Sequence, residues 1–452
     1  MGAPRRPRGQ AGGLSADYIT SELSPTAQRL LAAAQRVLQR DGYAGVTLQR
    51  VADEAGAHKS LVTYHFGTKA TLMTLLVDSL WHDLDVELLH TADALPPHSE
   101  LRIEAIIDAQ RRLGHLTAQQ QMYQDLFPNL IRREDTRRHL AELMRSYRDL
   151  HRRFLSATGL PDDDVAALGG LVLAVGDGMA VSLLVRPGKV DDEAAYALLQ
   201  DMVLTLTHEA RRERGAGAGA AGLRRPEAAP ASALRDDPAA TPPAGAGLTL
   251  GDDPLAGLPP VARKLARGAL RVLRKRGFAA LTLEAVGREA GEPPSSITYY
   301  FGDKRGLVTT VVEAQFHEQR RLLVRMIGDA GEESACRVRA VCAARELLTD
   351  LASFRVFFDL LPVLTRDEEL SGLPAAHDRW LVDLMEAGLR TSADPAVAGR
   401  TGAIALLQLA AADGLAMQAL SDPRGFDPLP SCAMLERLLE RHLPPLDAGG
   451  GA

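Results

Sequence analysis

The sequence predicts an all-α protein made of two tandem copies of one unit. Apolar residues recur at helical spacing along the chain, and no stretch alternates polar and apolar residues between hairpin turns. Residues 25–80 align without a gap with residues 260–315, and 24 of the 56 aligned positions are identical. The 452 residues provide material for more than one ordinary domain, so a duplication accounts for the length.

The composition excludes several classes of protein. With 46% hydrophobic and 24% charged residues, the chain can bury real cores, unlike a fibrous or disordered protein. Its three cysteines, Cys336, Cys342 and Cys432, are too few for a disulfide framework and lack zinc-site spacing. The N-terminal arginines have no apolar stretch behind them, as a secretory signal requires. We therefore expect a cytoplasmic protein that uses no metal and no cofactor.

The first helix of each copy is marked by an apolar stripe. Apolar residues stand at i, i+4, i+7 and i+8 within residues 30–38 and again within residues 265–273. Gly42 and Gly277 follow these stripes and are expected to end the helices.

A second, short helix follows in each copy. Thr47 and Thr282 are good N-caps for it, and Gly56 and Gly291 stand just past its end, where a left-handed backbone favours glycine. A third short helix comes almost at once, and a fourth starts a few residues later. Two short helices joined by a glycine turn predict a helix-turn-helix that offers its second helix to a DNA major groove.

The residues around these helices are more specific. GYAGVTLQRVADEAG (42–56) aligns with GFAALTLEAVGREAG (277–291), and SLVTYHFGTKATL (60–72) aligns with SSITYYFGDKRGL (295–307). At these residues the chain resembles the TetR family of one-component transcriptional regulators, once in each copy. The resemblance implies two tandem TetR-like units, each with an N-terminal three-helix helix-turn-helix domain and a C-terminal helical domain for ligand binding and dimerisation.

The expected domain order combines this resemblance with a Gly/Ala/Pro-rich stretch between the copies, which has too little bulky apolar surface to fold. It runs as a disordered basic N-terminal arm (1–24), the first helix-turn-helix domain (25–80), the first helical regulatory domain (81–214), a flexible linker (215–257), the second helix-turn-helix domain (258–315), the second helical regulatory domain (316–445) and a disordered tail (446–452).

The resemblance to the TetR family also implies which residues contact DNA phosphates. They are hydroxyl side chains, an imidazole and lysines at helix N-termini, which position the protein on the DNA without reading its bases. They are Thr47, Tyr64, His65 and Lys69 in the first copy and Thr282, Tyr299, Tyr300 and Lys304 in the second. For one tyrosine of each pair, simple packing is the alternative. Base reading would fall to the exposed face of the third helix. The candidates are Ala57, His58, Lys59, Ser60, Leu61 and Thr63 in the first copy and Glu292, Pro294, Ser295, Ser296 and Thr298 in the second. Val62, Ile297, Phe66 and Phe301 are expected in the core.

Positive charge is concentrated in the two aligned segments. Residues 25–80 carry a net charge of +2 and residues 260–315 a net charge of +5, which leaves −13 for the rest of a chain whose total is −6. This is where phosphates would lie. A solvated helix face is the alternative for Arg271, Arg274, Lys275 and Arg276.

The two copies differ where bases would be read. His58-Lys59 aligns with Pro293-Pro294, which removes a cation and two N–H donors from the second reading helix. The second helix-turn-helix therefore reads different bases or binds DNA more weakly. A fused pair with unequal reading helices should prefer an asymmetric or imperfectly palindromic operator.

Two apolar runs approach the length of a membrane span, residues 168–185 and 402–420. Each carries an aspartate near its middle, Asp177 or Asp413, and a carboxylate at the bilayer centre costs about 2.5–3.5 kcal/mol. We therefore expect buried helices and no membrane. The family implies a four-helix interface, for which the candidates are Val165–Val185 with Glu193–Arg211 against Pro395–Leu420 with Ala433–His442.

These helices suggest that the two copies pair within one chain as a pseudo-dimer. A 43-residue flexible linker spans roughly 33–39 Å, enough to cross such a dimer. Further homo-oligomerisation stays possible.

The resemblance also implies a small-molecule effector bound among the central helices. Polar and aromatic residues that interrupt apolar helices could line the effector pocket, and core packing is the alternative for each of them. The candidates are Tyr123, Asp125 and Asn129 in the first copy and Phe354, Phe357, Asp359, His377 and Trp380 in the second. Pro128 and Pro362 are expected to kink or end their helices.

The sequence thus predicts a regulator, expected to be a repressor, that binds a double-stranded DNA operator and is released by an effector. No nucleophile elbow, phosphate-binding glycine loop or His/Glu metal pair is present, so we expect no enzyme. The alternative is a ligand- or partner-binding module in which the second helix-turn-helix is a degenerate dimerisation scaffold.

Overall fold

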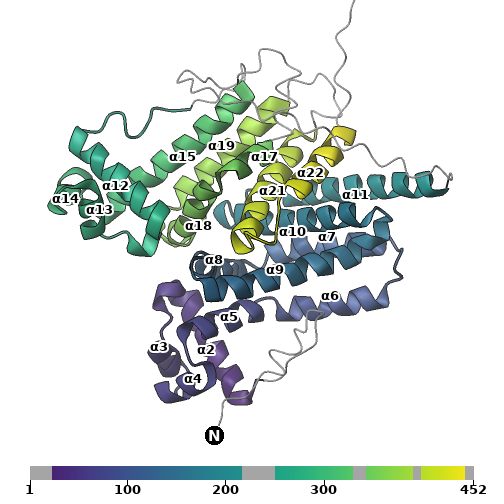
Figure 1. Ribbon diagram of the computed structural model, residues 1–452, viewed down its shortest axis with the longest axis horizontal. Coiled ribbons are helices and arrows are strands. Elements are labelled where there is room, and N and C mark those ends of the chain that lie inside the picture. The colour runs from purple at the N-terminus through teal and green to yellow at the C-terminus, as the bar shows by residue number, and fades with distance from the viewer. Residues whose placement is uncertain (1–22, 216–249, 329–342, 390–398, 443–452) are drawn as a thin grey trace, which may run out of the picture.

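The computed structural model describes residues 23–215, 250–328, 343–389 and 399–442, and the secondary structure of these residues is entirely helical (Figure 1). The all-α prediction is therefore confirmed. The predicted N-terminal arm up to residue 22, most of the linker, the tail and two cysteines, Cys336 and Cys342, lie outside the described residues. Cys432 is a buried free thiol.

The first helix-turn-helix domain, here called the first head, consists of α2 (Pro25–Gly45), α3 (Leu48–Glu54) and α4 (Lys59–Phe66), followed by α5 (Lys69–Ser79). Helix α2 is interrupted at Gly42, whose φ of 66° lies in the left-handed region, and one further turn follows. The predicted end at Gly42 is thus a break in the helix. Thr47 caps α3 as expected, its Oγ1 accepting from the Arg50 amide at 3.1 Å.

The second head repeats this order with α12 (Pro260–Arg276), the 3-10 turn η2 (Phe278–Ala280), α13 (Leu283–Ala290) and α14 (Ser295–Phe301), followed by α15 (Lys304–Gly328). Thr282 caps α13 through the Ala285 amide at 3.1 Å. Within the stretch predicted as linker, residues 250–257 pack against the protein. Leu255 is buried against the second head, and Arg263 donates to its carbonyl at 3.0 Å, while Leu250 packs against the larger core.

The first regulatory domain contains α6 (His82–Ala94), α7 (Leu101–Gly114), α8 (Thr117–Arg132), α9 (Glu134–Leu155), the 3-10 turn η1 (Ser156–Thr158), α10 (Asp162–Val185) and α11 (Asp192–Gly215). The second contains α17 (Ala343–Leu347), the 3-10 turn η3 (Leu348–Asp350), α18 (Leu351–Arg366), α19 (Gly372–Leu389), α21 (Thr401–Ser421) and α22 (Leu429–His442). Pro128 and Pro362 lie inside α8 and α18, and neither ends its helix, because both helices continue for about another turn and are packed on their neighbours.

Helices α10 and α21 pack against each other more extensively than any other pair of described helices. Both are long and apolar enough to cross a membrane, but 83% and 94% of their most apolar windows are buried inside the protein. Two glycines let the backbones approach: a Cβ added to Gly178 would lie 1.9 Å from the Ala410 carbonyl oxygen, and one added to Gly414 would lie 1.9 Å from that of Ala174. Helices α11 and α22 flank this contact.

The heads join the body differently. One apolar core runs from the first head through both regulatory domains, whereas the second head has its own core, which α18 completes with Val356, Leu360 and Leu364. Figure 1 shows the heads at the left and lower edges of the molecule, with α8 and α18 between them. Each head therefore rests on one of these two helices.

Candidate nucleic-acid interface and ligand cavities

Helices α4 and α14 present their predicted reading faces to solvent. Val62 and Ile297 are fully buried and anchor the helices, as expected. Phe66 is buried, whereas Phe301 is half-buried. On the opposite face Tyr64 and Tyr299 are each 81% exposed, by far the most exposed large aromatic side chains described.

The side chains predicted to hold phosphates surround these two helices. Tyr64 lies edge-on to His65 with ring centroids 5.1 Å apart, and Tyr299 lies edge-on to Tyr300 at 4.8 Å. His65 and Tyr300 are half-buried, so each pair offers one exposed ring braced by a second. Such a hydroxyl on a rigid ring can donate to a phosphate oxygen with little loss of side-chain entropy.

Thr47 and Thr282 are helix caps that are also predicted to contact phosphates. Thr47 and Thr282 use their oxygens to accept from α3 and α13. The Thr47 hydroxyl also has one hydrogen to donate, so this cap can reach a phosphate oxygen without giving up its bond to α3. The Thr282 hydroxyl already donates to the Glu284 carboxylate, so it has to change its partner to reach a phosphate.

Lys69 and Lys304 are held by aromatic rings. The Lys69 ammonium lies 3.9 Å from the ring centroid of Tyr43 and donates to the Tyr43 carbonyl at 2.8 Å, and burial lowers its pKa. Lys304 lies 4.9 Å from the ring centroid of Phe278, the residue that aligns with Tyr43. An ammonium has three donors, so Lys69 keeps donors for a phosphate. Sequence reasoning missed these cation–π pairs, although the repeated Gly-aromatic motif was the signal for them.

The base-reading candidates divide by exposure. His58, Lys59, Ser60 and Thr63 are exposed and Leu61 is half-buried; Pro294, Ser295 and Thr298 are exposed and Ser296 is half-buried. Among the described residues, the Lys59 ammonium has no hydrogen-bond or ion-pair partner, so it is available to DNA. Helix α14, with the sequence SSITYYF, carries no lysine or arginine.

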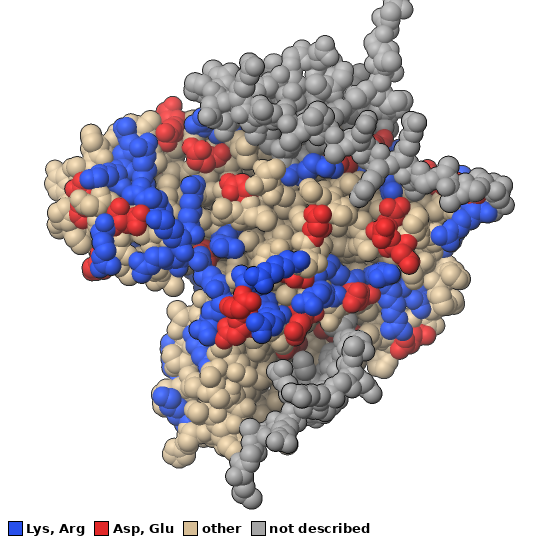
Figure 2. Space-filling view, in the orientation of Figure 1, with Lys and Arg blue, Asp and Glu red and all other residues tan. Residues whose placement is uncertain are grey.

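The basic residues of the leading helices are largely paired. Arg36 and Arg40 both bind Glu54 on α3, and Arg271 and Lys275 both approach Glu289 on α13. Figure 2 shows lysine and arginine gathered over the second head and along the seam between the lower head and the body. The ion pairs fix the leading helix against the next one, as in a solvated face, and leave Lys59 as the cation of the first reading helix.

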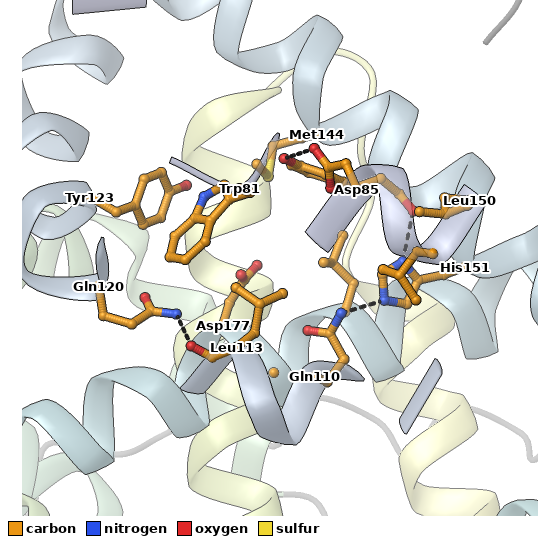
Figure 3. Close-up of a pocket in the computed structure, with 14 residues that line it drawn as sticks. Trp81, Asp85, Gln110, Leu113, Gln120, Tyr123, Met144, Leu150, His151 and Asp177 are labelled. Carbon is orange, nitrogen blue, oxygen red and sulfur yellow. Dashed lines mark hydrogen bonds between the residues drawn. The ribbon is translucent and has the colours of Figure 1, made fainter. Parts of the chain in front are cut away.

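A cavity lies inside the first regulatory domain (Figure 3). Trp81 and Asp85 line it beside Tyr123 of α8, His151 of α9 and Asp177 of α10. The Asp177 carboxylate and the Tyr123 hydroxyl each have a buried oxygen without a hydrogen-bond partner among the described residues. Such a concave site with few polar groups is what a small-molecule ligand needs.

Burial shifts the pKa values of three side chains that line this cavity. It raises the pKa of Asp177 to about 7, and that of Asp85 to about 7 against the opposing hydrogen bond from the Tyr147 hydroxyl. Burial also lowers the pKa of His151 to about 4, so its imidazole is neutral and hydrogen-bonds Gln110 at 2.8 Å.

A second cavity occupies the equivalent place in the second regulatory domain. Phe357 and Asp413 line it at the positions that align with Tyr123 and Asp177. His377 stacks on Phe316 with centroids 4.0 Å apart, and burial lowers its pKa well below the usual value. The second cavity also contains Asp378, whose carboxylate forms an ion pair with Arg186 of the first repeat.

The effector candidates therefore divide. Tyr123 lines the first cavity, and Phe354, Phe357 and His377 line the second. Asp125, Asn129, Asp359 and Trp380 line neither. The two aspartates form ion pairs between the repeats, the Asn129 amide donates to the Asp125 carbonyl at 3.3 Å, and Trp380 packs under the Arg320 guanidinium. Asp177 and Asp413 were missed as lining residues, although a carboxylate inside an apolar helix was the signal.

Comparison with known proteins identifies the heads. The family description "Bacterial regulatory proteins, tetR family" matches residues 30–75 and, separately, residues 265–311. A second description, "Tetracyclin repressor-like, C-terminal domain", matches residues 99–206. The chain belongs to the TetR family, with two family units fused in tandem.

Relatives of this TetR-family chain are transcriptional regulators by name. HTH-type transcriptional regulator BetI of Rhizobium meliloti (strain 1021) is 26% identical over 205 residues, which cover 42% of this chain and 93% of the relative. BetI of Stenotrophomonas maltophilia (strain R551-3) is 26% identical over 28% of this chain and 67% of the relative. "Probable HTH-type transcriptional regulator ArpR" of Pseudomonas putida is 31% identical over 20% of this chain and 48% of the relative. The Rhizobium protein thus corresponds in length to about one repeat, and this chain is a TetR-family transcriptional regulator of DNA-binding type.

Proposed function

We propose that this TetR-family regulator is a cytoplasmic repressor that binds its operator as a single-chain pseudo-dimer and is released by a small-molecule effector. The observation that carries the proposal is the backbone-close contact between α10 and α21, which joins the repeats through Gly178 and Gly414. The exposure of both reading helices supports the proposal, because a protein that enters two successive grooves needs two such helices on one body.

The unequal heads support an asymmetric operator. Lys59 can reach the two acceptors of a guanine from α4, whereas α14 offers hydroxyls and no cation. The first head would therefore specify its half-site more strongly, and the second head would contribute chiefly phosphate contacts through Tyr299, Thr282 and Lys304.

The experiment is selection of bound DNA from a random pool by the full-length chain. The proposal expects a site with two unequal halves about one helical turn apart, bound by one chain in sedimentation. A perfect palindrome bound by two chains would overturn the single-chain arrangement.

The lack of a lysine or arginine on α14 favours an alternative in which the second head is a dimerisation scaffold without DNA contact. Gel-shift assays of Lys59→Ala and Ser296→Ala separate the two possibilities. The proposal expects both variants to weaken binding, the first more than the second, whereas a scaffold predicts that only Lys59→Ala has an effect.

A further inference from the structure

The duplication has produced a reciprocal pair of ion pairs between the repeats. Asp125 and Arg132 of α8 align with Asp359 and Arg366 of α18. Each aspartate bonds the arginine of the other repeat: the Arg132 Nε donates to Asp359 at 3.1 Å, and the Arg366 Nε donates to Asp125 at 3.2 Å. Both aspartate side chains are nearly inaccessible to solvent, at 4% and 2% exposure, so neither pair is a surface contact.

Each arginine also reaches the head of the opposite repeat. Arg366 donates to the carbonyls of Gln39 at 3.1 Å and Leu38 at 3.3 Å, in the last turn of α2 before Gly42. These carbonyls lie just before the break in α2, and a cation at the C-terminal end of a regular helix is favourable. The first head is thus held by a side chain of the second regulatory domain.

A related contact occurs at the other head, where the arginine packs against the end of the helix. The Arg132 guanidinium lies against Gly277 at the end of α12, so closely that a Cβ on Gly277 would lie 2.4 Å from its Cζ. Gly277 aligns with Gly42, and the Asp359 carboxylate accepts a hydrogen bond from the neighbouring Phe278 backbone. The second head is thus held by a side chain of the first regulatory domain.

The helices that carry these arginines also line the cavities. Gln120 and Tyr123 of α8 line the first cavity, and Phe354 and Phe357 of α18 line the second. Pro128 and Pro362 stand between the cavity residues and the arginines and remove one helical hydrogen bond from each helix. A change at either cavity can therefore move the arginine at the far end of the same helix.

We propose that Arg132 and Arg366 are positioning residues that act crosswise, so that each cavity sets the position of the head of the opposite repeat. The proposal rests on the proposed function for its DNA consequences, and its geometry stands apart from it. Arg366 fixes the first head through the end of α2, and Arg132 fixes the second head through the end of α12.

Hydrogen exchange of the full-length chain without DNA tests the geometry. Arg366→Met is expected to speed exchange roughly tenfold around Gly42 in the first head, and Arg132→Met around Gly277 in the second. The controls Arg138→Met and Arg379→Met remove exposed arginines that pair within their own helix, with Glu134 and Asp383. Faster exchange in the head of the variant's own repeat, or in neither head, would overturn the proposal.

Because a single substitution leaves a carboxylate buried without its cation, the double variant Asp125→Asn/Arg366→Met covers the case in which Arg366→Met does not fold. It is expected to loosen the first head only. Uniform loosening of both heads in a folded double variant also overturns the proposal.

Footprinting on the selected operator adds a readout that a general loss of stability would not move. Arg366→Met should lose protection on the half-site of the first head, and Arg132→Met on that of the second. If the chain binds no DNA, the proposed function fails while crosswise exchange still supports the positioning role. If both variants lose both half-sites equally, the crosswise assignment fails while DNA binding stands.

Discussion

Substituting Gly178 by alanine tests how closely the two repeats are joined. The added Cβ would lie 1.9 Å from the Ala410 carbonyl oxygen and 2.8 Å from the Ala410 Cα. These are backbone atoms of a buried helix, so no side chain can rotate away. Helix α21 has to retreat by roughly 1 Å or more before the contact becomes an ordinary van der Waals distance.

The expected cost follows from two opposing effects. Overpacking of a well-packed core typically costs about 1–3 kcal/mol. Replacing glycine by alanine inside a helix contributes about 1 kcal/mol in the other direction. Gly178→Ala should therefore lower the free energy of unfolding by up to about 2 kcal/mol, and the retreat of α21 should widen the separation of the heads.

The control is Gly372→Ala, the same chemical change at the start of α19, where an added Cβ meets no atom within 4 Å. Urea unfolding and the distance between spin labels on the two heads are the measurements. We expect Gly372→Ala to leave both unchanged or to raise stability slightly. If Gly178→Ala stabilises the chain as much as the control and leaves the label distance unchanged, the helices do not approach as closely as this reasoning requires.

Three further predictions follow from the cavity, the core and the heads. The folded-state pKa of Asp177, about 7, lies above the unfolded value of about 3.9. Between these values the folded protein holds a proton that the unfolded chain has lost, so this group makes wild-type stability fall as pH rises from about 4 to 7. Asp177→Asn should remove the contribution of Asp177 to that slope and leave that of Asp85. The variant should be more stable than wild type at pH 8 by up to about 4 kcal/mol in chemical unfolding, with the difference vanishing near pH 4; a pH-independent difference would contradict the assignment. Phe358→Ala should cost about 3–5 kcal/mol in chemical unfolding, because the ring is fully buried and meets Phe127 of the other repeat edge-on at 5.3 Å; a smaller loss than that of a surface variant would refute it. Tyr64→Phe should weaken operator binding about fivefold in gel shifts and leave the melting temperature unchanged, because the side chain is exposed and only its hydroxyl is lost.

Local sequence signals predicted the heads well. The caps at Thr47 and Thr282, the glycines after α3 and α13 and the buried Val62 and Ile297 depend on contacts within a few residues or on a short helical period. Such contacts are encoded in neighbouring residues, so the sequence carries them without reference to the rest of the chain.

Features that depend on two distant helices were predicted less well. Asp125 and Asp359 were predicted to line an effector pocket because they are polar residues within apolar helices. The packing of α8 on α18 instead places each of them against an arginine of the other repeat. Asp177 identifies its helix as buried, but which neighbours leave a space beside it depends on α6, α8 and α9 together.

By itself, the sequence determined the helical fold, its duplication and the two DNA-reading motifs, because spacing and capping act over one or two helical turns. The tertiary structure alone decided which glycine meets which backbone, where the cavities lie and which arginine holds which head. Those outcomes depend on the relative placement of helices more than 200 residues apart, as in the Asp125–Arg366 pair, and no local pattern specifies that placement.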